Sequence, residues 1–385
     1  MIINPARRTE SVKEYYFSVK NRQIARMNAD GRQEPVINLG IGAPNGMPPQ
    51  EAIDELCTVA RKSGVHAYQS YTGIPELRMA FADWYWKWYG VSLDCNKEIQ
   101  PLTGSKEGIL IVSLAFLNPG DKVLVPDPGY PTYTSAARLC EAEVVNYDLL
   151  EENGWQPDFD ALGKMDLEGV KMMWTNYPGM PTGAPASPGL YRRLVDFGRR
   201  HGILICNDNP YSFILTENRY SILAVPGARD CCLELNSLSK AHNMSGWRIG
   251  MVASSAEVIS EVLKVKSQLD SGMFRPLQLA AVKALAQGPE WFAKLNAEYA
   301  RRREAASKIF DLLGAHYSKD SQGLFLWGRV EGDPEAISDK LLLEAGVFIT
   351  PGFVFGRNGK QYLRISLCAN VEVYERALEK IKEVL

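Results

Sequence analysis

The sequence lacks a strong charge of either sign. Its 385 residues include 43 basic and 45 acidic side chains, which gives a net charge of −2. A nearly neutral chain offers no electrostatic reason to bind nucleic acid or an anionic membrane, so we expect neither partner. Small molecules are the expected ligands.

Long hydrophobic runs are also missing. The longest apolar stretch covers residues 109–117, whereas a helix needs about 20 apolar residues to cross a bilayer. The first residues turn polar almost at once and do not form the apolar core of a secretory signal peptide. We therefore expect no membrane span and a cytoplasmic location.

Cysteine and histidine occur without the spacing of metal ligands. The seven cysteines are scattered and odd in number, which predicts reduced thiols in the core. The four histidines show no pair at helical spacing, so we expect no metal site. Only His242 stands inside a segment with other chemically active side chains.

What the sequence does contain is an alternation of strands and helices. From about residue 97, short and almost continuously apolar runs are followed by a polar or glycine-rich turn and then a helix. This pattern predicts an α/β protein with a mostly parallel, seven-stranded sheet sandwiched by helices. The predicted strands lie at residues 99–102, 123–125, 143–147, 170–174, 203–206, 231–235 and 249–253.

A chain of this length exceeds what one hydrophobic core usually supports, so we expect two domains. We predict that residues 51–288 form the large domain that contains the sheet. A long polar-faced helix from about residue 289 is placed to bridge to a smaller α+β domain. This small domain would combine residues 1–50, with an N-terminal helical arm, and residues 289–385.

The segment from Ser237 to Gly250 follows one of these strands and collects reactive side chains. It contains three serine hydroxyls, an amine at Lys240 and a guanidinium at Arg248. Hydroxyls and an arginine are suited to hold a phosphate, and a lysine beside a cation keeps more of its amine neutral and nucleophilic. Either the segment binds a phosphorylated carbonyl cofactor at Lys240, or it is a polar surface turn with a solvated lysine.

Polar and aromatic residues follow other strands at the same predicted edge of the sheet. Asp208 and Tyr211 lie three residues apart, which suits a ring with one protonated nitrogen and one oxygen acceptor. A proline-stiffened loop presents Tyr130 to a flat ligand, and residues 103–108 offer glycines, a hydroxyl and free amides at a helix start. Each loop alone could be a structural turn, but ligands of open α/β sheets bind where strand ends converge.

Arg364 lies in an alternating strand near the end of the sequence. An arginine in such a strand is either a surface cation or, if it faces a cleft, a two-point grip for a carboxylate. The preceding residues 351–356 form either a mobile wall of that cleft or a turn that packs two aromatic rings.

Together these motifs resemble those of the class I and II aminotransferases, which are pyridoxal-phosphate enzymes of fold type I. The resemblance rests on Ser-Leu-Ser-Lys-Ala-His-Asn-Met-Ser-Gly-Trp-Arg-Ile-Gly, Tyr-Pro-x-x-Pro-Thr-Gly, Asp-x-x-Tyr and Tyr-x-Arg-Ile-Ser, in order over about residues 36–368. Two glycine-rich loops favour the branch with the aspartate- and diaminopimelate-type enzymes. The resemblance implies an aminotransferase that acts between an L-amino acid and a 2-oxo acid.

The resemblance also implies a role for each motif residue. Lys240 would form a Schiff base with pyridoxal 5′-phosphate and carry the proton, while Asp208 pairs with the ring nitrogen and Tyr211 with the ring oxygen. Tyr68 would reach the phosphate in the neighbouring subunit of a homodimer. The implied cofactor-binding residues are Gly104, Ser105, Lys106, Tyr130, Asn176, Asp208, Tyr211, Ser237, Ser239, Lys240, Arg248 and Tyr68. Gly42 and Arg364 would hold the α-carboxylate of the substrate.

One residue departs from the family pattern. An asparagine that donates a hydrogen bond to the cofactor ring oxygen usually precedes Pro-Thr-Gly, whereas this chain has Met180 there. A thioether donates no hydrogen bond, so the ring oxygen should become more basic. We expect Tyr211 or Asn176 to compensate for the missing donor.

Two other functions stay open at the level of sequence. The cofactor apparatus does not select the reaction, so a carbon–sulfur β-lyase on the same scaffold is the alternative enzyme. A cofactor-binding protein without catalysis is the alternative from another class, although the complete set of lysine, aspartate and arginine argues against it. The sequence does not identify the amino donor. Arg275 either contacts a distal carboxylate, faces a partner subunit or is solvated.

Overall fold

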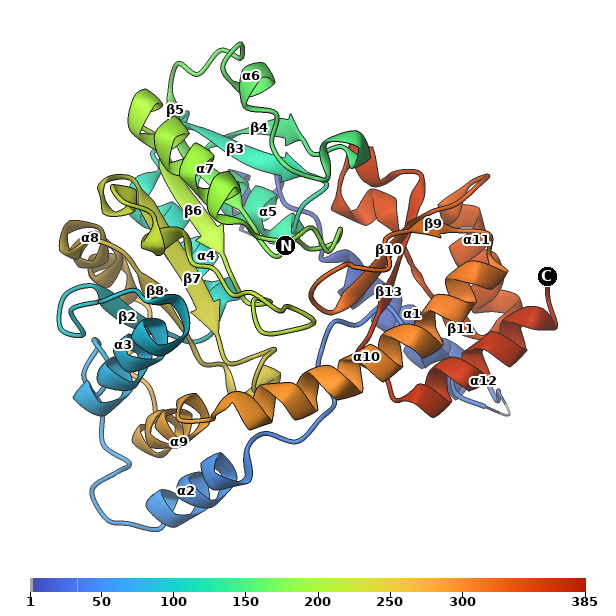
Figure 1. The fold of residues 1–385 in the computed structure, drawn as a ribbon, viewed down its shortest axis with the longest axis horizontal. Helices are drawn as coiled ribbons and strands as arrows, with labels where there is room; N and C mark the ends of the chain where they lie inside the picture. Colours follow the sequence, from blue (N-terminus) through green and yellow to red (C-terminus); the bar gives the residue numbers. More distant parts are fainter. Residues whose placement is uncertain (1–2, 33) are drawn as a thin grey trace.

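The structure is a computed structural model that describes residues 3–32 and 34–385, and its centre is a seven-stranded sheet (Figure 1). The strands of this sheet are β2 (Ile99–Leu102), β3 (Lys122–Asp127), β4 (Glu143–Asp148), β5 (Val170–Thr175), β6 (Leu204–Asp208), β7 (Cys232–Ser237) and β8 (Gly250–Ala253). Their order is β2-β8-β7-β6-β5-β3-β4. Only β8 runs antiparallel to its neighbours. The predicted α/β fold with a mostly parallel sheet is confirmed.

Helices cover both faces of the sheet (Figure 1). The α-helices of the described residues, whether they pack on this sheet or elsewhere, are α1 (Tyr16–Ala29), α2 (Gln50–Ala60), α3 (Pro75–Tyr89), α4 (Ser105–Phe116), α5 (Pro131–Leu139), α6 (Phe159–Leu162), α7 (Pro188–His201), α8 (Ala256–Lys266), α9 (Arg275–Leu285), α10 (Pro289–Leu312), α11 (Pro334–Lys340) and α12 (Val371–Lys382). Consecutive strand residues face opposite layers. Met172 and Trp174 pack with α4, α5 and α8, while Met173 between them packs with α3, α7 and α9. Burial on both faces explains why the strands read as unbroken apolar runs.

The sequence also sets where helices begin and end, as α7 illustrates. The Ser187 hydroxyl accepts a hydrogen bond from the backbone N–H of Leu190 at 3.1 Å and so caps the first turn. Gly202 ends the helix in the left-handed conformation, with φ of 65°, which glycine adopts without steric cost. The next strand, β6, therefore starts immediately and carries its end toward the site.

A second, smaller set of sheets packs beside the first. The antiparallel order β12-β13-β10-β9 joins β9 (His316–Tyr317), β10 (Phe325–Arg329), β12 (Thr350–Pro351) and β13 (Tyr362–Ser366). Near the N-terminus, β1 (Ile37–Asn38) pairs in parallel with β11 (Val347–Phe348). The segment that follows the N-terminal helix therefore belongs with the C-terminal strands. The long helix α10 runs from the side of α9 toward these strands (Figure 1).

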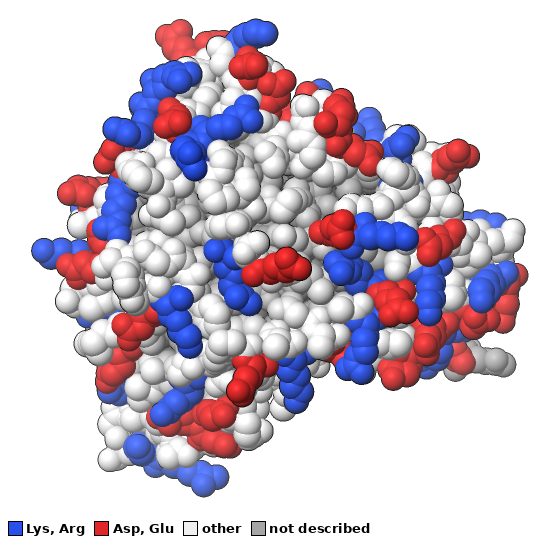
Figure 2. Space-filling view, in the orientation of Figure 1, with Lys and Arg blue, Asp and Glu red and all other residues white. Residues whose placement is uncertain are grey.

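The surface and the cysteines complete the description. On the face shown in Figure 2, basic and acidic side chains are intermingled and form no extended patch of one sign. Within residues 3–32 and 34–385, no helix is long and apolar enough to cross a bilayer, and no group of three His, Cys, Asp or Glu side chains is placed to hold a metal ion. The cysteines are free thiols, and five of the seven are buried. Cys57 is exposed, so the prediction of a core thiol is wrong there.

Candidate active site

A cavity of about 460 Å³ lies at the carboxyl ends of the parallel strands, between the seven-stranded sheet and the small antiparallel sheet. Asp208 ends β6 and Ser237 ends β7, and both side chains line the cavity. Arg364 reaches it from β13 on the opposite side. All the site residues named from the sequence line this cavity except Gly104 and Tyr68. The fold thus brings together motifs that are far apart in the chain.

Lys240 lies three residues beyond the end of β7. Its Nζ donates a hydrogen bond to the carbonyl oxygen of Gly42, in the segment that follows β1. Burial lowers the pKa of Lys240 below its usual 10.5, and the positive charges of Arg364 and Arg248 act in the same direction. A lower pKa increases the fraction of neutral amine, which is the form that attacks a carbonyl group.

Asp208 is only 5% exposed and is partly unsatisfied. Its Oδ2 accepts a hydrogen bond from the hydroxyl of Tyr133 at 3.0 Å, whereas Oδ1 has no partner among the described residues. Burial raises the pKa of Asp208 to about 7, although the Tyr133 hydrogen bond and the charge of Lys240 oppose this shift. A buried carboxylate oxygen without a partner costs free energy, so the side chain is suited to a ligand with a cationic N–H donor.

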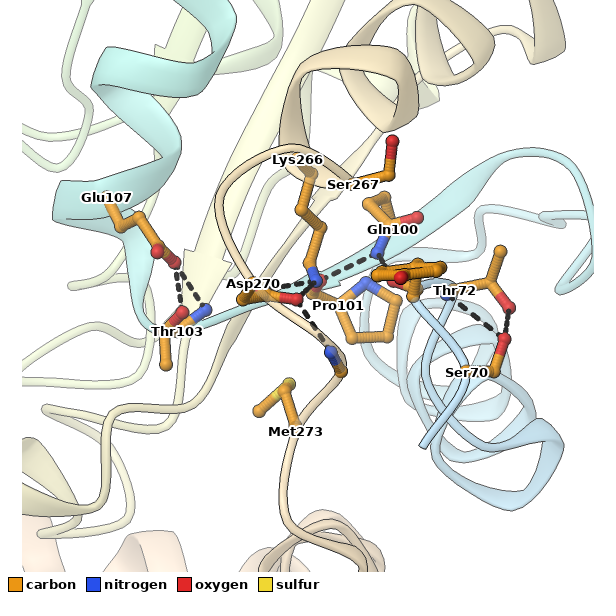
Figure 3. Close-up of polar contacts among 12 residues, drawn as sticks. Ser70, Thr72, Gln100, Pro101, Thr103, Glu107, Lys266, Ser267, Asp270 and Met273 are labelled. Carbon is orange, nitrogen blue, oxygen red and sulfur yellow. Dashed lines mark hydrogen bonds and ion pairs between the residues drawn. The ribbon is translucent and has the colours of Figure 1, made fainter. Parts of the chain in front are cut away.

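The amino end of α4 forms another wall of the cavity. Glu107, in the first turn, accepts hydrogen bonds from the hydroxyl of Thr103 and from its backbone N–H, the latter at 2.9 Å (Figure 3). These bonds tie the end of β2 to the start of α4. Ser105 and Lys106 begin the helix and line the cavity, where free backbone amides favour an anion.

Arg248 and Ser237 extend this anion-binding surface. A Cβ atom at Gly104 would overlap the guanidinium of Arg248, and Gly104 also has a positive φ of 85°. Arg248 is oriented by a hydrogen bond from Nη1 to the carbonyl oxygen of Ser245 at 2.8 Å. The hydroxyl of Ser237 is buried and has no partner among the described residues. Helix amides, a guanidinium and a free hydroxyl suit a phosphate group.

Aromatic rings hold the strand ends in place. The ring of Tyr133 stacks on Trp174 with centroids 5.0 Å apart, and Tyr130 packs edge-on against Tyr133 at 5.6 Å. Tyr130 lines the cavity as the sequence predicted. Tyr133, whose hydroxyl donates a hydrogen bond to Asp208, was not predicted from the sequence to be a site residue. Its spacing of three residues from Tyr130 across the start of α5 was the available signal.

Arg364 is 3% exposed and lies on the side of the cavity opposite Asp208 and Ser237. Its Nη2 donates a hydrogen bond to the carbonyl oxygen of Gly40 at 2.7 Å, and its Nη1 lies 3.4 Å from the sulfur of Met180. The Asn176 amide donates to the carbonyl oxygen of Asp208 at 2.6 Å and accepts from the N–H of Met180 at 2.7 Å. Met180 thus contacts the expected carboxylate-binding arginine. Compensation by Tyr211 or Asn176 stays a prediction.

Tyr68 is 89% exposed and lies outside the cavity. The loop that carries it is anchored by a hydrogen bond, because the side-chain amide of Gln100 donates to the carbonyl oxygen of Tyr71 at 3.0 Å. The neighbouring loop after α8 is held by an ion pair in which the buried Lys266 places its Nζ 2.8 Å from both carboxylate oxygens of the half-buried Asp270 (Figure 3). Two anchored loops therefore present Tyr68 at the surface of this chain.

Two other residues considered from the sequence do not line the cavity. Arg275 forms an ion pair with Glu76 of α3 at 3.1 Å. His242 is 1% exposed, packs edge-on against Phe292, and has no partner for either ring nitrogen among the described residues. Burial lowers the pKa of His242 to about 3, so the imidazole is neutral and belongs to the core.

Tyr15 and Phe17 line the cavity from the start of α1. The sequence predicted an N-terminal helical arm within residues 1–50 but gave it no part in the site. Aromatic residues in an amphipathic helix are indistinguishable from core residues until the position of the helix is known. The arm is therefore part of the site as well as an N-terminal extension.

Comparison with known proteins adds a family to this geometry. The sequence profile described as aminotransferase class I and II matches residues 34–381. An LL-diaminopimelate aminotransferase from Dehalococcoides mccartyi is 38% identical over 380 residues, covering 98% of this chain and 97% of that protein. The enzyme of the same name from Moorella thermoacetica is also 38% identical, covering 99% and 98%.

Solved structures show the same arrangement of elements. The apo structure of BacF from Bacillus subtilis superposes with a TM-score of 0.95 at 32% identity, covering 100% of this chain and 99% of that chain. The aspartate aminotransferase from Thermus thermophilus with maleate superposes with a TM-score of 0.91 at 26% identity, covering 100% of both chains. The similarity thus extends over both sheets and the cavity between them.

Proposed function

The chain belongs to the class I and II aminotransferases, and from this membership we propose that it binds pyridoxal 5′-phosphate at Lys240. It is an aminotransferase, which exchanges the amino group of an amino acid for the oxo group of a 2-oxo acid. The family and its solved relatives are pyridoxal-phosphate enzymes of this fold. The relatives from Dehalococcoides mccartyi and Moorella thermoacetica are named as aminotransferases, so the lyase alternative receives no support from them.

The observation that carries the proposal is the set of buried polar atoms without partners around one cavity. Oδ1 of Asp208, the hydroxyl of Ser237 and Nε of Arg364 all lack a partner among the described residues. A cationic ring nitrogen matches Asp208, a phosphate matches Ser237 and the start of α4, and a substrate carboxylate matches Arg364. The cavity residues therefore fit the cofactor and an amino acid together.

The chain supplies binding, orientation and proton transfer. When bound, pyridoxal phosphate supplies an electron sink for the negative charge that develops at the substrate α-carbon. Asp208 would keep the proton on the ring nitrogen, and Tyr130 would cover one face of the ring. Arg364 would orient the substrate so that Nζ of Lys240 can remove the proton from its α-carbon. The same Nζ would then deliver this proton to a carbon atom of the cofactor.

We also propose the assembly around the site. Tyr68 would complete the phosphate-binding surface of a second copy of the chain, since its exposed ring does not reach the cavity of its own chain. The large domain would comprise residues 51–288, and the small domain residues 1–50 and 289–385. The separate hydrophobic clusters of the two sheets support this division. A cytoplasmic location stays a prediction from the sequence.

The proposed reaction is tested by whether product formation requires a 2-oxo acid as the amino-group acceptor. Purified protein with pyridoxal phosphate and an amino donor should form product continuously only when a 2-oxo acid is present. Initial rates should give parallel double-reciprocal lines, because the donor product leaves before the acceptor binds. Sustained release of ammonia and oxo acid without any acceptor would instead identify a lyase.

A further inference from the structure

Part of the cavity has walls made of aromatic rings. Tyr15 and Phe17 at the start of α1, Phe325 of β10 and Phe355 after β12 line this part. We call these four residues the aromatic wall. The ring centroids of Phe17 and Phe355 lie 6.4 Å apart, so the N-terminal arm and the C-terminal sheet contribute to one surface.

The aromatic wall encloses the guanidinium of Arg364. Its central carbon lies 4.0 Å from the ring centroid of Phe325 and 4.5 Å from that of Phe355. Phe17 lies on a further side at 5.3 Å. Rings at these distances attract the cation and exclude water from it. A substrate whose α-carboxylate binds Arg364 would place its neighbouring atoms close to these rings.

Few charges of this chain reach the cavity. Among the described residues its only carboxylate is Asp208, and its cations are Lys106, Lys240, Arg248 and Arg364. Three of these cations have the roles proposed above. Nζ of Lys106 lies 4.3 Å from the ring centroid of Tyr15, at the end of α4 that we assign to the phosphate. The phosphate that we propose at the start of α4 would pair with Lys106, so a second charged group on a substrate would find no unassigned counter-ion within this chain.

We propose that this aminotransferase prefers amino acids with a neutral, apolar side chain, such as a hydrocarbon ring or a branched chain, and that Tyr15 and Phe17 select them. The inference rests on the proposed function, because it requires the substrate α-carboxylate to bind Arg364. An apolar side chain gains free energy by burial against the aromatic wall. A second carboxylate or ammonium group would lose its hydration there without an opposite charge.

Equilibrium binding of unreactive carboxylates tests this selectivity without turnover. Calorimetry on the purified protein with its pyridoxal phosphate compares 3-phenylpropionate, which carries a ring, with glutarate, which carries a second carboxylate. We expect 3-phenylpropionate to bind at least about tenfold more tightly, because only its ring can be buried. Equal affinities, or tighter binding of glutarate, would overturn the proposal.

Substitutions in the arm identify the selecting residue. The variant Phe17→Ser should bind 3-phenylpropionate about tenfold more weakly and should lose less affinity for glutarate, because both ligands need Arg364 but only 3-phenylpropionate buries a ring against Phe17. Val19→Ser is the matched control, because Val19 lies two residues further along α1, is 44% exposed and does not line the cavity. If thermal unfolding shows that Phe17→Ser does not fold, Phe17→Leu replaces it with a smaller expected loss. Equal losses for both ligands, or no loss, would contradict the assignment.

The first half-reaction separates this proposal from the proposed function. Loss of the cofactor absorbance is followed in a single turnover with L-phenylalanine, L-leucine, L-glutamate and LL-diaminopimelate. We expect kcat/KM to be at least about tenfold higher for the two apolar amino acids. If the two charged substrates react faster, the side-chain preference is wrong and the proposed function stands. If no amino acid changes the absorbance, the proposed function itself is wrong.

Discussion

Asp208 is a single residue whose surroundings prepare the site for a ligand. One carboxylate oxygen is bonded to Tyr133 and the other has no partner among the described residues. Burial raises its pKa from 3.8 to about 7 in the chain alone. A bound cation would remove this penalty, because an opposite charge favours the ionised carboxylate. We propose that the free energy lost by folding around Asp208 is recovered when the cofactor binds.

The raised pKa predicts how the stability of the cofactor-free protein depends on pH. Between about pH 4 and 7 the folded protein binds more protons at Asp208 than the unfolded protein does, so stability falls as pH rises through this window. At about 1.4 kcal/mol per pKa unit, the loss at pH 8 is about 4 kcal/mol. The free energy of unfolding, measured with urea, should therefore decrease less with rising pH in the Asp208→Asn variant than in the natural protein.

The control for this prediction is Asp83→Asn, which removes an exposed carboxylate from α3. It should keep the pH dependence of the natural protein. If Asp208→Asn also keeps it, then the carboxylate of Asp208 is not destabilised by burial and the account of this residue is wrong.

Single residues also show what the sequence could and could not predict. Lys240, Asp208 and Arg364 were identifiable because each is a charged residue at a strand end or in a family motif. Tyr133 and Phe17 were not, because an aromatic ring in an amphipathic helix usually belongs to the core. Their contacts with the site depend on how separate elements pack, which no local pattern contains.

Among the elements, the start of α4 is the one that we propose binds the phosphate. The helix begins directly after β2, and Gly104 between them allows the Arg248 guanidinium to lie against the backbone. Glycine is needed there for two reasons, since φ is positive and a side chain would overlap Arg248. The proposed phosphate-binding surface thus depends on a backbone feature as well as on side chains.

Substitution of Gly104 by alanine tests this element. We expect Gly104→Ala to weaken the binding of pyridoxal phosphate by about tenfold, because Arg248 must move, and to cost about 1 kcal/mol of folding stability. Absorbance titration measures the affinity, and urea unfolding measures the stability. Gly90→Ala is the matched control: Gly90 also has a positive φ of 66°, but a Cβ atom there meets nothing within 4 Å. It should lose stability and keep its affinity, and an equal loss of affinity in both variants would refute the role of Gly104.

The strands were predictable because their physical cause is local. Burial on both faces requires continuous apolar runs, and all seven predicted strands are present with ends that differ by at most two residues. The direction of β8, which runs antiparallel, is not encoded in such a run. Strand direction depends on the connecting segments, and here the loop that carries Lys240 returns the chain into an antiparallel neighbour.

For the whole molecule, we propose that a second chain completes the cavity between the two sheets. Tyr68 is presented outward by anchored loops, and we propose that it acts in the site of a partner. Mixed dimers test this. Lys240→Ala and Tyr68→Ala homodimers should both be impaired, whereas a hybrid would contain one intact site. Random mixing by co-expression should restore about a quarter of the natural activity, because half the dimers are hybrids with one functional site each.

The matched control for the mixed dimers is the double variant Lys240→Ala with Tyr68→Ala, paired with the natural chain. This variant carries both changes on one chain. In its hybrid with the natural chain, one site therefore has Lys240 but lacks Tyr68, and the other site has Tyr68 but lacks Lys240. This hybrid should show no gain over what the natural homodimers in the mixture provide. If the hybrid with both changes on one chain were as active as the hybrid with one change on each chain, shared sites would be refuted.

Covalent capture of the cofactor tests the central claim most directly. The purified protein is treated with pyridoxal phosphate and borohydride, digested, and examined by mass spectrometry, with Lys240→Arg as the control. We predict a single stable phosphopyridoxyl group on Lys240, and none at this position in the control. Labelling spread over surface lysines, or no label on Lys240, would contradict the assignment of this residue and of the site built around it.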